Sequence, residues 1–70
     1  MANDSYPVRK VSPSTCTFAE LPAGSLDLYN VSSEDGWLGI GTPDELRQLV
    51  EDGIFPPAER LTFTREWAAA

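Results

Sequence analysis

Histidine is absent from this chain, and cysteine occurs once, at Cys16. A chain without histidine has no ordinary general base near neutral pH and no Ser–His or Cys–His catalytic pair. A lone cysteine forms no intrachain disulfide, and without histidine it cannot complete a structural zinc site. We therefore expect no enzymatic activity, no bound metal and no cofactor.

Long apolar runs are also missing. No stretch approaches the roughly 18 consecutive apolar residues that a membrane-spanning helix needs. The N-terminal segment is polar and lacks the apolar region of a signal peptide. A lone cysteine is typical of a reducing compartment. The expectation is a cytoplasmic protein without membrane association.

Basic residues are scarce, because five Lys and Arg stand against eleven Asp and Glu, for a formal net charge of −6. The imbalance is greatest between Glu20 and Asp52, where Arg47 is the one basic residue. Such a surface repels phosphate groups, so direct binding of nucleic acid is not expected. It suits a basic partner, including a DNA-binding protein, although acidity also keeps small proteins soluble.

The length of 70 residues indicates a single domain with a small core. Without a disulfide or a metal, net stability at this size rarely exceeds about 3–5 kcal/mol. We therefore expect very tight packing or self-association, and a homodimer is the favoured form. The hydrophobic fraction of 41% is too high for a disordered chain.

Alternating apolar and polar residues predict short strands at residues 15–21, 26–31, 37–40 and 61–64, and a short edge strand at 8–11. Asp35-Gly36 is a strong hairpin signal between the second and third of these segments. Gly39 and Gly41 leave one face of the segment at 37–40 bare. We expect a bulky group to pack over them.

The strongest local pattern predicts a helix over about residues 43–52. Thr42 and Glu45 have the spacing of a capping box at its start. Gly53 is placed to end the helix in the left-handed conformation, with Ile54 folding back in a Schellman motif. The apolar stripe of this helix consists of Leu46, Leu49 and Val50.

Together these elements predict an α+β fold, a small antiparallel β-meander with one packed helix at about 43–52 and a C-terminal strand. The predicted domain organisation has three parts. Residues 1–14 form a flexible N-terminal arm, residues 15–67 form a single α+β domain, and residues 68–70 form a tail.

Between Arg9 and Phe55 the chain resembles domain of unknown function 397, an actinobacterial family that includes BldB-like regulators. The chain departs from the family where Val8 and Leu46 replace two tryptophans, and residues 56–70 lie beyond the usual family end. The segments that carry the resemblance in order and spacing are Arg9-Lys10-Val11-Ser12, Cys16 to Ala19, Leu26 to Asn30 with Ser32, Asp35-Gly36, Leu38-Gly39-Ile40 and Thr42-Pro43-Asp44-Glu45-Leu46.

The resemblance implies a partner, because such proteins are commonly encoded beside helix-turn-helix regulators and are thought to modulate them. We therefore expect a small acidic protein-binding module that modulates a helix-turn-helix transcription regulator. Two alternatives stay open, a phage-type anti-defence inhibitor or DNA mimic, and a structural subunit of an assembly. Acidic residues chosen by charge density and two aromatic anchors make up the predicted partner-binding site, which consists of Glu34, Asp35, Trp37, Asp44, Glu51, Asp52 and Trp67.

Overall fold

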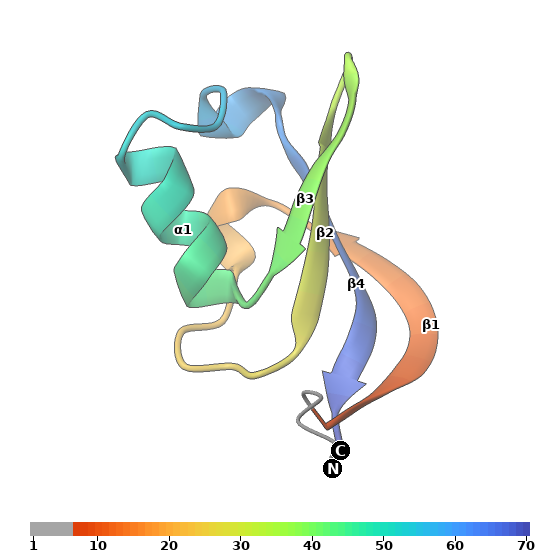
Figure 1. Cartoon of the computed structure of the whole chain (residues 1–70). Helices are drawn as coiled ribbons and strands as arrows, with labels where there is room; N and C mark the ends of the chain where they lie inside the picture. The colour runs from red at the N-terminus through yellow and green to blue at the C-terminus, as the bar shows by residue number, and fades with distance from the viewer. Residues whose placement is uncertain (1–6) are drawn as a thin grey trace, which may run out of the picture.

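Four strands form one antiparallel sheet with one α-helix packed beside it in the computed structural model, which describes residues 7–70 (Figure 1). The α+β class, the antiparallel sheet, the packed helix and the C-terminal strand are thus confirmed. The strands are β1 (Val8–Cys16), β2 (Leu28–Ser33), β3 (Gly36–Gly41) and β4 (Thr62–Ala69). The helix is α1 (Pro43–Glu51), and two 3₁₀ turns are η1 (Phe18–Glu20) and η2 (Ala58–Arg60).

The C-terminal strand lies inside the sheet, because β4 pairs with both β1 and β2. The order of neighbours is β1-β4-β2-β3, so β1 and β3 are the two edges, and the sheet is not the predicted meander because β4 lies between β1 and β2. The expected Asp35-Gly36 hairpin joins β2 to β3, and Gly36 has a φ of +125° in its turn. The rest of the sheet depends on contacts between segments that are far apart in sequence.

The N-terminal edge corrects the predicted domain boundaries. Half of the expected arm at 1–14 belongs to the sheet as β1, which includes the predicted edge strand at 8–11, while residues 1–6 lie outside the described residues. The ladder between β1 and β4 is irregular between Lys10 and Ser14. Pro13, which has no backbone donor, falls in this irregular stretch. Pairing with β4 thus overrides a composition that is typical of a loop.

Two further boundaries differ from the prediction. The expected strand at 15–21 ends at Cys16 and continues as η1. The backbone N–H of Thr17 donates to the Glu20 carboxylate at 2.8 Å, so a local side-chain bond favours a turn over an extended chain. At the other end, the ladder with β1 continues through most of the expected tail at 68–70.

The helix α1 begins and ends as predicted. The Thr42 N–H donates to the Glu45 carboxylate at 2.9 Å, and the Glu45 N–H donates to the Thr42 hydroxyl at 3.4 Å, which confirms the capping box. Gly53 has a φ of +76°, and the Ile54 N–H donates to the Leu49 carbonyl at 3.0 Å. These contacts confirm the Schellman motif.

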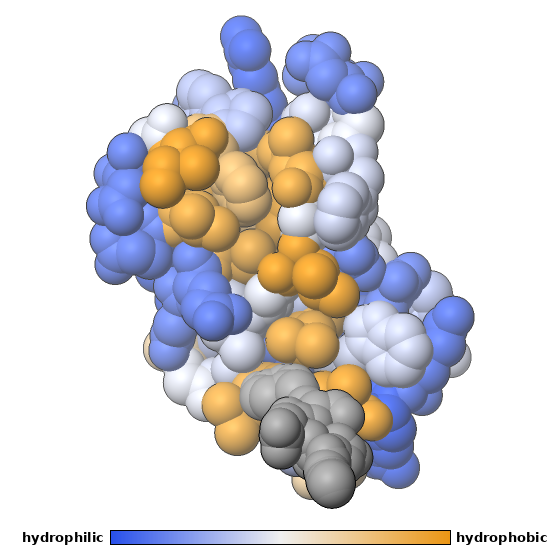
Figure 2. Space-filling model, in the orientation of Figure 1, coloured by the Kyte–Doolittle hydropathy of each residue, from blue (hydrophilic) through white to orange (hydrophobic). Residues whose placement is uncertain are grey.

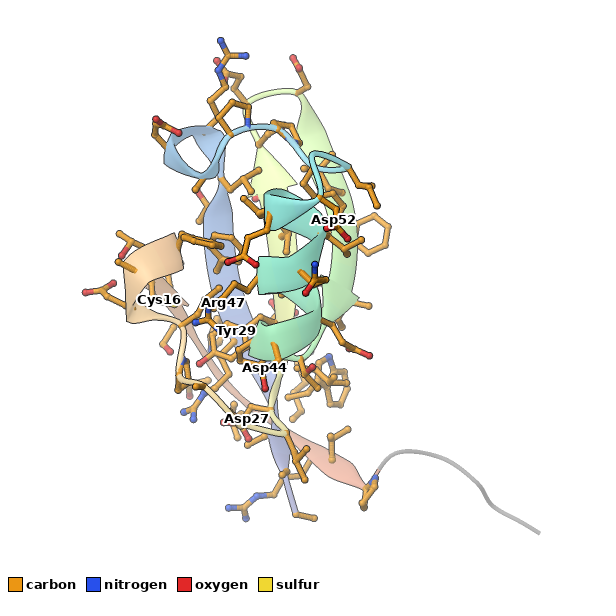
Figure 3. All side chains as sticks on the ribbon, turned by 90° about the vertical axis from the view of Figure 1, so that its left-hand side faces the viewer. Cys16, Asp27, Tyr29, Asp44, Arg47 and Asp52 are labelled. Carbon is orange, nitrogen blue, oxygen red and sulfur yellow. The ribbon has the colours of Figure 1, made fainter. Side chains whose placement is uncertain are left out.

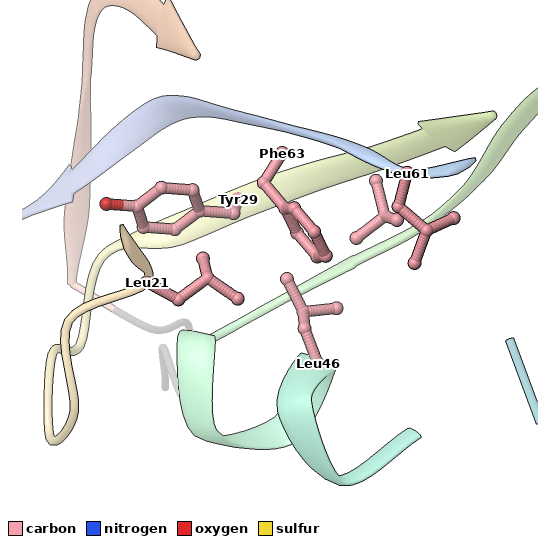
Figure 4. Packing of buried hydrophobic residues seen from close by; sticks show 6 residues of the cluster. Leu21, Tyr29, Leu46, Leu61 and Phe63 are labelled. Atoms are coloured by element: carbon pink, nitrogen blue, oxygen red, sulfur yellow. The ribbon is translucent and has the colours of Figure 1, made fainter. Parts of the chain in front are cut away.

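The core lies between α1 and the sheet (Figure 4). Leu46 of α1 points toward Phe63 of β4, and both side chains are fully buried. Phe55 covers bare Gly39, since a Cβ at that glycine would lie 3.6 Å from the ring, which confirms the expected bulky cover. The buried hydrophobic residues of the described chain are Leu21, Tyr29, Val31, Leu46, Leu61 and Phe63.

Candidate functional site

Three of the predicted partner-binding residues lie together in the β2–β3 hairpin. Glu34 and Asp35 form its turn and are exposed, and Trp37 follows in β3 with 65% of its surface exposed. Within residues 7–70, neither carboxylate forms a salt bridge or a hydrogen bond. A large exposed aromatic ring therefore lies close along the chain to two carboxylates that have no partner among the described residues.

The side chain of Trp37 is held in place despite its exposure. Its indole N–H donates to the amide oxygen of Asn30 at 2.9 Å, and the amide nitrogen of Asn30 donates to Glu66 at 2.8 Å. These two bonds connect β3, β2 and β4. A ring whose orientation is already fixed loses little conformational entropy when a partner packs on it. Sequence reasoning missed Asn30 and Glu66, because only the strand register brings them together.

The remaining predicted carboxylates are separated by the length of α1, with Asp44 and Asp52 at opposite ends (Figure 3). Asp44 accepts bonds from the Gly24 backbone N–H and from Arg47, each at 3.2 Å, so it contributes to the fold. Glu51 and Asp52 are exposed. Their end of α1 and the hairpin tip lie at the same end of the molecule (Figure 1).

Trp67 is half-buried in β4, an inner strand of the sheet. It pairs with Lys10 of β1 on one side and with Leu28 of β2 on the other. The Lys10 ammonium lies 5.7 Å from the centre of the indole ring, within the range of a cation–π contact. Trp67 therefore packs within the sheet, and Trp37 is the tryptophan that the fold exposes.

An apolar groove lies between β3 and α1. Ile40, on β3, is 46% exposed, and Ile54, just after α1, is 66% exposed. Apolar surface continues from the end of α1 across β3 (Figure 2). Sequence reasoning missed this groove, because the gap between a helix and a sheet edge is a property of packing. The groove has a volume of about 480 Å³ and is lined by Ile40, Glu45, Leu46, Gln48 and Leu49.

The groove and the exposed tryptophan are neighbours. Asn30 is the ladder partner of Ile40 and also holds the indole of Trp37. Opposite residues of a ladder share one face of the sheet, so the side chains of Ile40 and Asn30 lie on the face away from buried Val31, and Trp37 reaches Asn30 on that face. We name this region the β3–α1 surface and define it as Trp37, Ile40, Glu45, Gln48, Leu49 and Ile54.

No basic residue belongs to the β3–α1 surface. Arg47 of α1 points elsewhere, because it donates to the Leu21 carbonyl at 2.6 Å and lies 5.8 Å from the centre of the Phe18 ring. Arg65 forms an ion pair with Asp27 at 3.2 Å. The other basic residues of the chain lie in β1 and η2. The surface is therefore apolar and bears only negative charge.

The titratable groups with shifted pKa values, Cys16 and Tyr29, lie on β1 and β2 and outside this surface. Burial raises the pKa of the Cys16 thiol, and the nearby Glu20 carboxylate adds to the shift. A thiol with a raised pKa is protonated and a poor nucleophile at neutral pH. Among residues 7–70, no group of three or more His, Cys, Asp or Glu is placed to hold a metal ion.

The helices of residues 7–70 lack the length and apolar character needed to cross a membrane. No family model, curated protein or solved structure matches the chain. The class of protein is therefore defined by the fold and by the β3–α1 surface. The chain is a small α+β domain with an exposed tryptophan and an apolar groove that bears negative charge.

Proposed function

We propose that this chain is a small acidic protein-binding module that modulates a helix-turn-helix transcription regulator. The observation that carries the proposal is the exposed Trp37, oriented by Asn30 and close to Glu34 and Asp35. Tryptophans are frequent energetic centres of protein interfaces. Carboxylates around such an anchor favour a basic partner and speed its association.

Two further arguments support the kind of partner and the cellular compartment that we propose. The resemblance to domain of unknown function 397 supports a helix-turn-helix regulator as the basic partner. Such regulators present Lys and Arg to DNA phosphates, which is the charge that this acidic chain complements. The cytoplasm is the proposed site of action, because a free cysteine such as Cys16 is typical of a reducing compartment.

The arrangement of the carboxylates gives less support to a DNA mimic. A mimic of duplex DNA has to offer negative charges in closely spaced rows, because DNA carries one charge per about 1.7 Å of its axis. Here more than half of the acidic side chains accept hydrogen bonds within the fold, and this fixes their directions. These side chains are Glu20, Asp27, Asp44, Glu45, Asp52 and Glu66.

Affinity capture tests the proposal. The tagged chain is incubated with extract of its source cell at low and at high salt, and bound proteins are identified by mass spectrometry. We expect one helix-turn-helix protein that is retained at low salt and lost at high salt, because exposed charge pairs are screened. Glu34→Gln should reduce the yield, and Glu59→Gln, which removes one exposed charge from η2, should leave it unchanged.

The alternatives predict other outcomes of the same capture. A nuclease or restriction complex would favour an anti-defence inhibitor and contradict the proposal. Recovery of the chain alone, as an oligomer, would favour a structural subunit. Capture of a helix-turn-helix protein that is held equally well at both salt concentrations would support the proposed partner. It would contradict the proposal that charge attracts this partner.

A further inference from the structure

The strand β3 is an open edge of the sheet. It pairs with β2 on one side, and its other side has no strand partner among the described residues. Alternate residues of such a strand direct their backbone N–H and C=O groups away from the sheet. No other segment of residues 7–70 forms a backbone hydrogen bond with this outer side. The outer side of β3 is therefore free to form a ladder.

The two edges of the sheet differ in how they discourage pairing. The edge strand β1 contains Arg9, Lys10 and Pro13 and has an irregular register, all of which hinder the addition of another strand. The edge strand β3 has no charged residue and no proline. Its one irregularity lies beside Val31 and Ser32, near the hairpin turn. Most of β3 therefore lacks the charged residues, the proline and the irregular register that hinder strand pairing at β1.

The groove lies directly beside this open edge. Ile40 belongs to β3 and also lines the groove, whose opposite wall is the Leu46 and Leu49 side of α1. Side chains of an added strand would point alternately to its two faces. One set would enter the apolar groove, while the backbone formed hydrogen bonds with β3. This combination of an edge and an adjacent pocket is the geometry of peptide recognition by strand addition.

The charge around the groove indicates which kind of segment binds beside β3. Glu45 lines the groove, Glu34 and Asp35 lie where β3 begins, and the groove has no basic residue. A second copy would bring the same carboxylates together on two chains that each carry a net charge of −6. Like charges placed opposite each other oppose association. A segment in which apolar residues alternate with Lys or Arg complements both the groove and its charge.

We propose that β3 binds an extended segment of the basic partner as an additional strand. Apolar side chains of this segment fill the groove between β3 and α1, and its basic side chains lie against Glu45 and the hairpin carboxylates. This inference rests on the proposed function, because it names the part of a basic partner that the module binds. In this arrangement the binding energy comes from a backbone ladder with β3 and from apolar contacts in the groove. Trp37 lies at one end of the binding site.

A peptide titration tests the proposal. The probe is a peptide of alternating Ile and Lys with six residues, the length of β3. A control peptide has the same side chains but all of its backbone amides N-methylated, so it cannot donate the hydrogen bonds of a ladder. We expect the probe to slow hydrogen exchange of the outward amides of β3, measured by NMR. The N-methylated peptide should bind at least about tenfold more weakly.

Two protein variants form a matched pair. Ile40→Arg places a positive charge on β3 beside the groove, and we expect it to weaken binding of the probe at least about tenfold. Thr15→Arg places the same side chain at an exposed position of the other edge strand and should leave binding unchanged. Circular dichroism checks that both variants fold. The N-methylated control decides the question without any variant if Ile40→Arg does not fold.

Three results would overturn the inference. The N-methylated peptide binds as tightly as the probe, or the amides of β3 gain no protection, or sedimentation shows a dimer that Ile40→Arg dissociates. The last result would assign the edge to a second copy. Failure of the proposed function is distinguishable from these, because it appears in the capture experiment as the absence of a basic partner. A captured regulator that leaves the β3 amides unprotected would contradict strand addition alone.

Discussion

Asn30 determines how the exposed tryptophan is presented. Its amide oxygen accepts the Trp37 indole N–H, and its amide nitrogen donates to Glu66. The side chain therefore connects an edge strand to the inner strand β4 through two directional bonds. Without these bonds, the largest exposed aromatic side chain would rotate freely and lose more entropy on binding.

Replacement of Asn30 tests this positioning. Asn30→Ala should lower the fluorescence anisotropy of Trp37, measured in a Trp67→Phe background in which Trp37 is the only tryptophan. The free energy of unfolding should fall by about 1 kcal/mol per lost hydrogen bond. Thr62→Ala, at an exposed position of β4, serves as the control. An unchanged anisotropy in Asn30→Ala would contradict the positioning role.

Because of Cys16 and Tyr29, the free energy of unfolding should depend on pH in the alkaline range. Burial is the main cause that raises the pKa of each side chain above its ordinary value. Both groups therefore hold their protons more tightly in the folded chain than in the unfolded chain. The folded state binds more protons at alkaline pH, so stability falls as the pH rises.

This decrease should begin above about pH 8.5, where the thiol of the unfolded chain ionises, and stability should be unaffected by these groups below that pH. Urea unfolding from neutral to alkaline pH measures the slope. Cys16→Ala should remove the earlier part of the decrease, and Tyr29→Phe the later part. Equal slopes in the wild-type chain and in both variants would contradict the assignment.

At the scale of elements, α1 could be predicted because its signals are local. Thr42 and Glu45 cap its start, Gly53 ends it, and all three act within a few residues of the helix. The Asp35-Gly36 turn of the hairpin is local in the same sense. The grouping of Glu34, Asp35 and Trp37 in one hairpin could therefore be predicted from the sequence.

Gly53 is the helix residue whose backbone conformation can be tested alone. Gly53→Ala should lower the free energy of unfolding by about 1–2 kcal/mol, because an L-residue is strained at a φ of +76°. No atom lies within 4 Å of the added Cβ, so the effect is one of conformation. Gly39→Ala is the control, since its Cβ meets Phe55 at an ordinary 3.6 Å. Denaturant unfolding measures both, and an equal effect of the two would contradict the account.

The features that the sequence left incomplete depend on distant partners. β1 was predicted as a strand only at residues 8–11, and it extends to Cys16 because β4, at the other end of the chain, pairs with it. Trp67 was predicted as an anchor by its type and its place near the end of the sequence. Lys10 and Leu28 flank it in the folded sheet. Neither neighbour could be identified from the local sequence, because no short-range signal sets the register of β4.

At the scale of the whole molecule, the core is small and depends strongly on individual side chains. Leu46 is fully buried in α1, as is Pro43 at the start of the helix, and Leu46 packs against the sheet. Leu46→Ala should cost about 2–5 kcal/mol, which is comparable to the whole stability of a chain of this size. Ile54→Ala, at a position that is 66% exposed, should cost less than about 1 kcal/mol. Thermal unfolding of both variants measures this, and a similar loss in both would contradict the assigned core.

The molecule as a whole has one edge that discourages pairing and one that is open. Arg9, Lys10 and Pro13 lie on β1, while the apolar groove, Glu34 and Asp35 lie beside β3. The sheet therefore separates a protected side from an exposed apolar and acidic side. The β3–α1 surface, with Trp37 at its hairpin end, is the surface from which we infer protein binding.

The most direct test of this account is the affinity of the captured partner for Trp37→Ala, measured by calorimetry. We predict a loss of about 30-fold, or about 2 kcal/mol, with little change in thermal unfolding, because the ring is exposed in the free chain. Trp67→Phe should change the affinity by no more than about twofold. Equal affinity of the wild-type chain and Trp37→Ala would contradict the account and place the binding site on another surface.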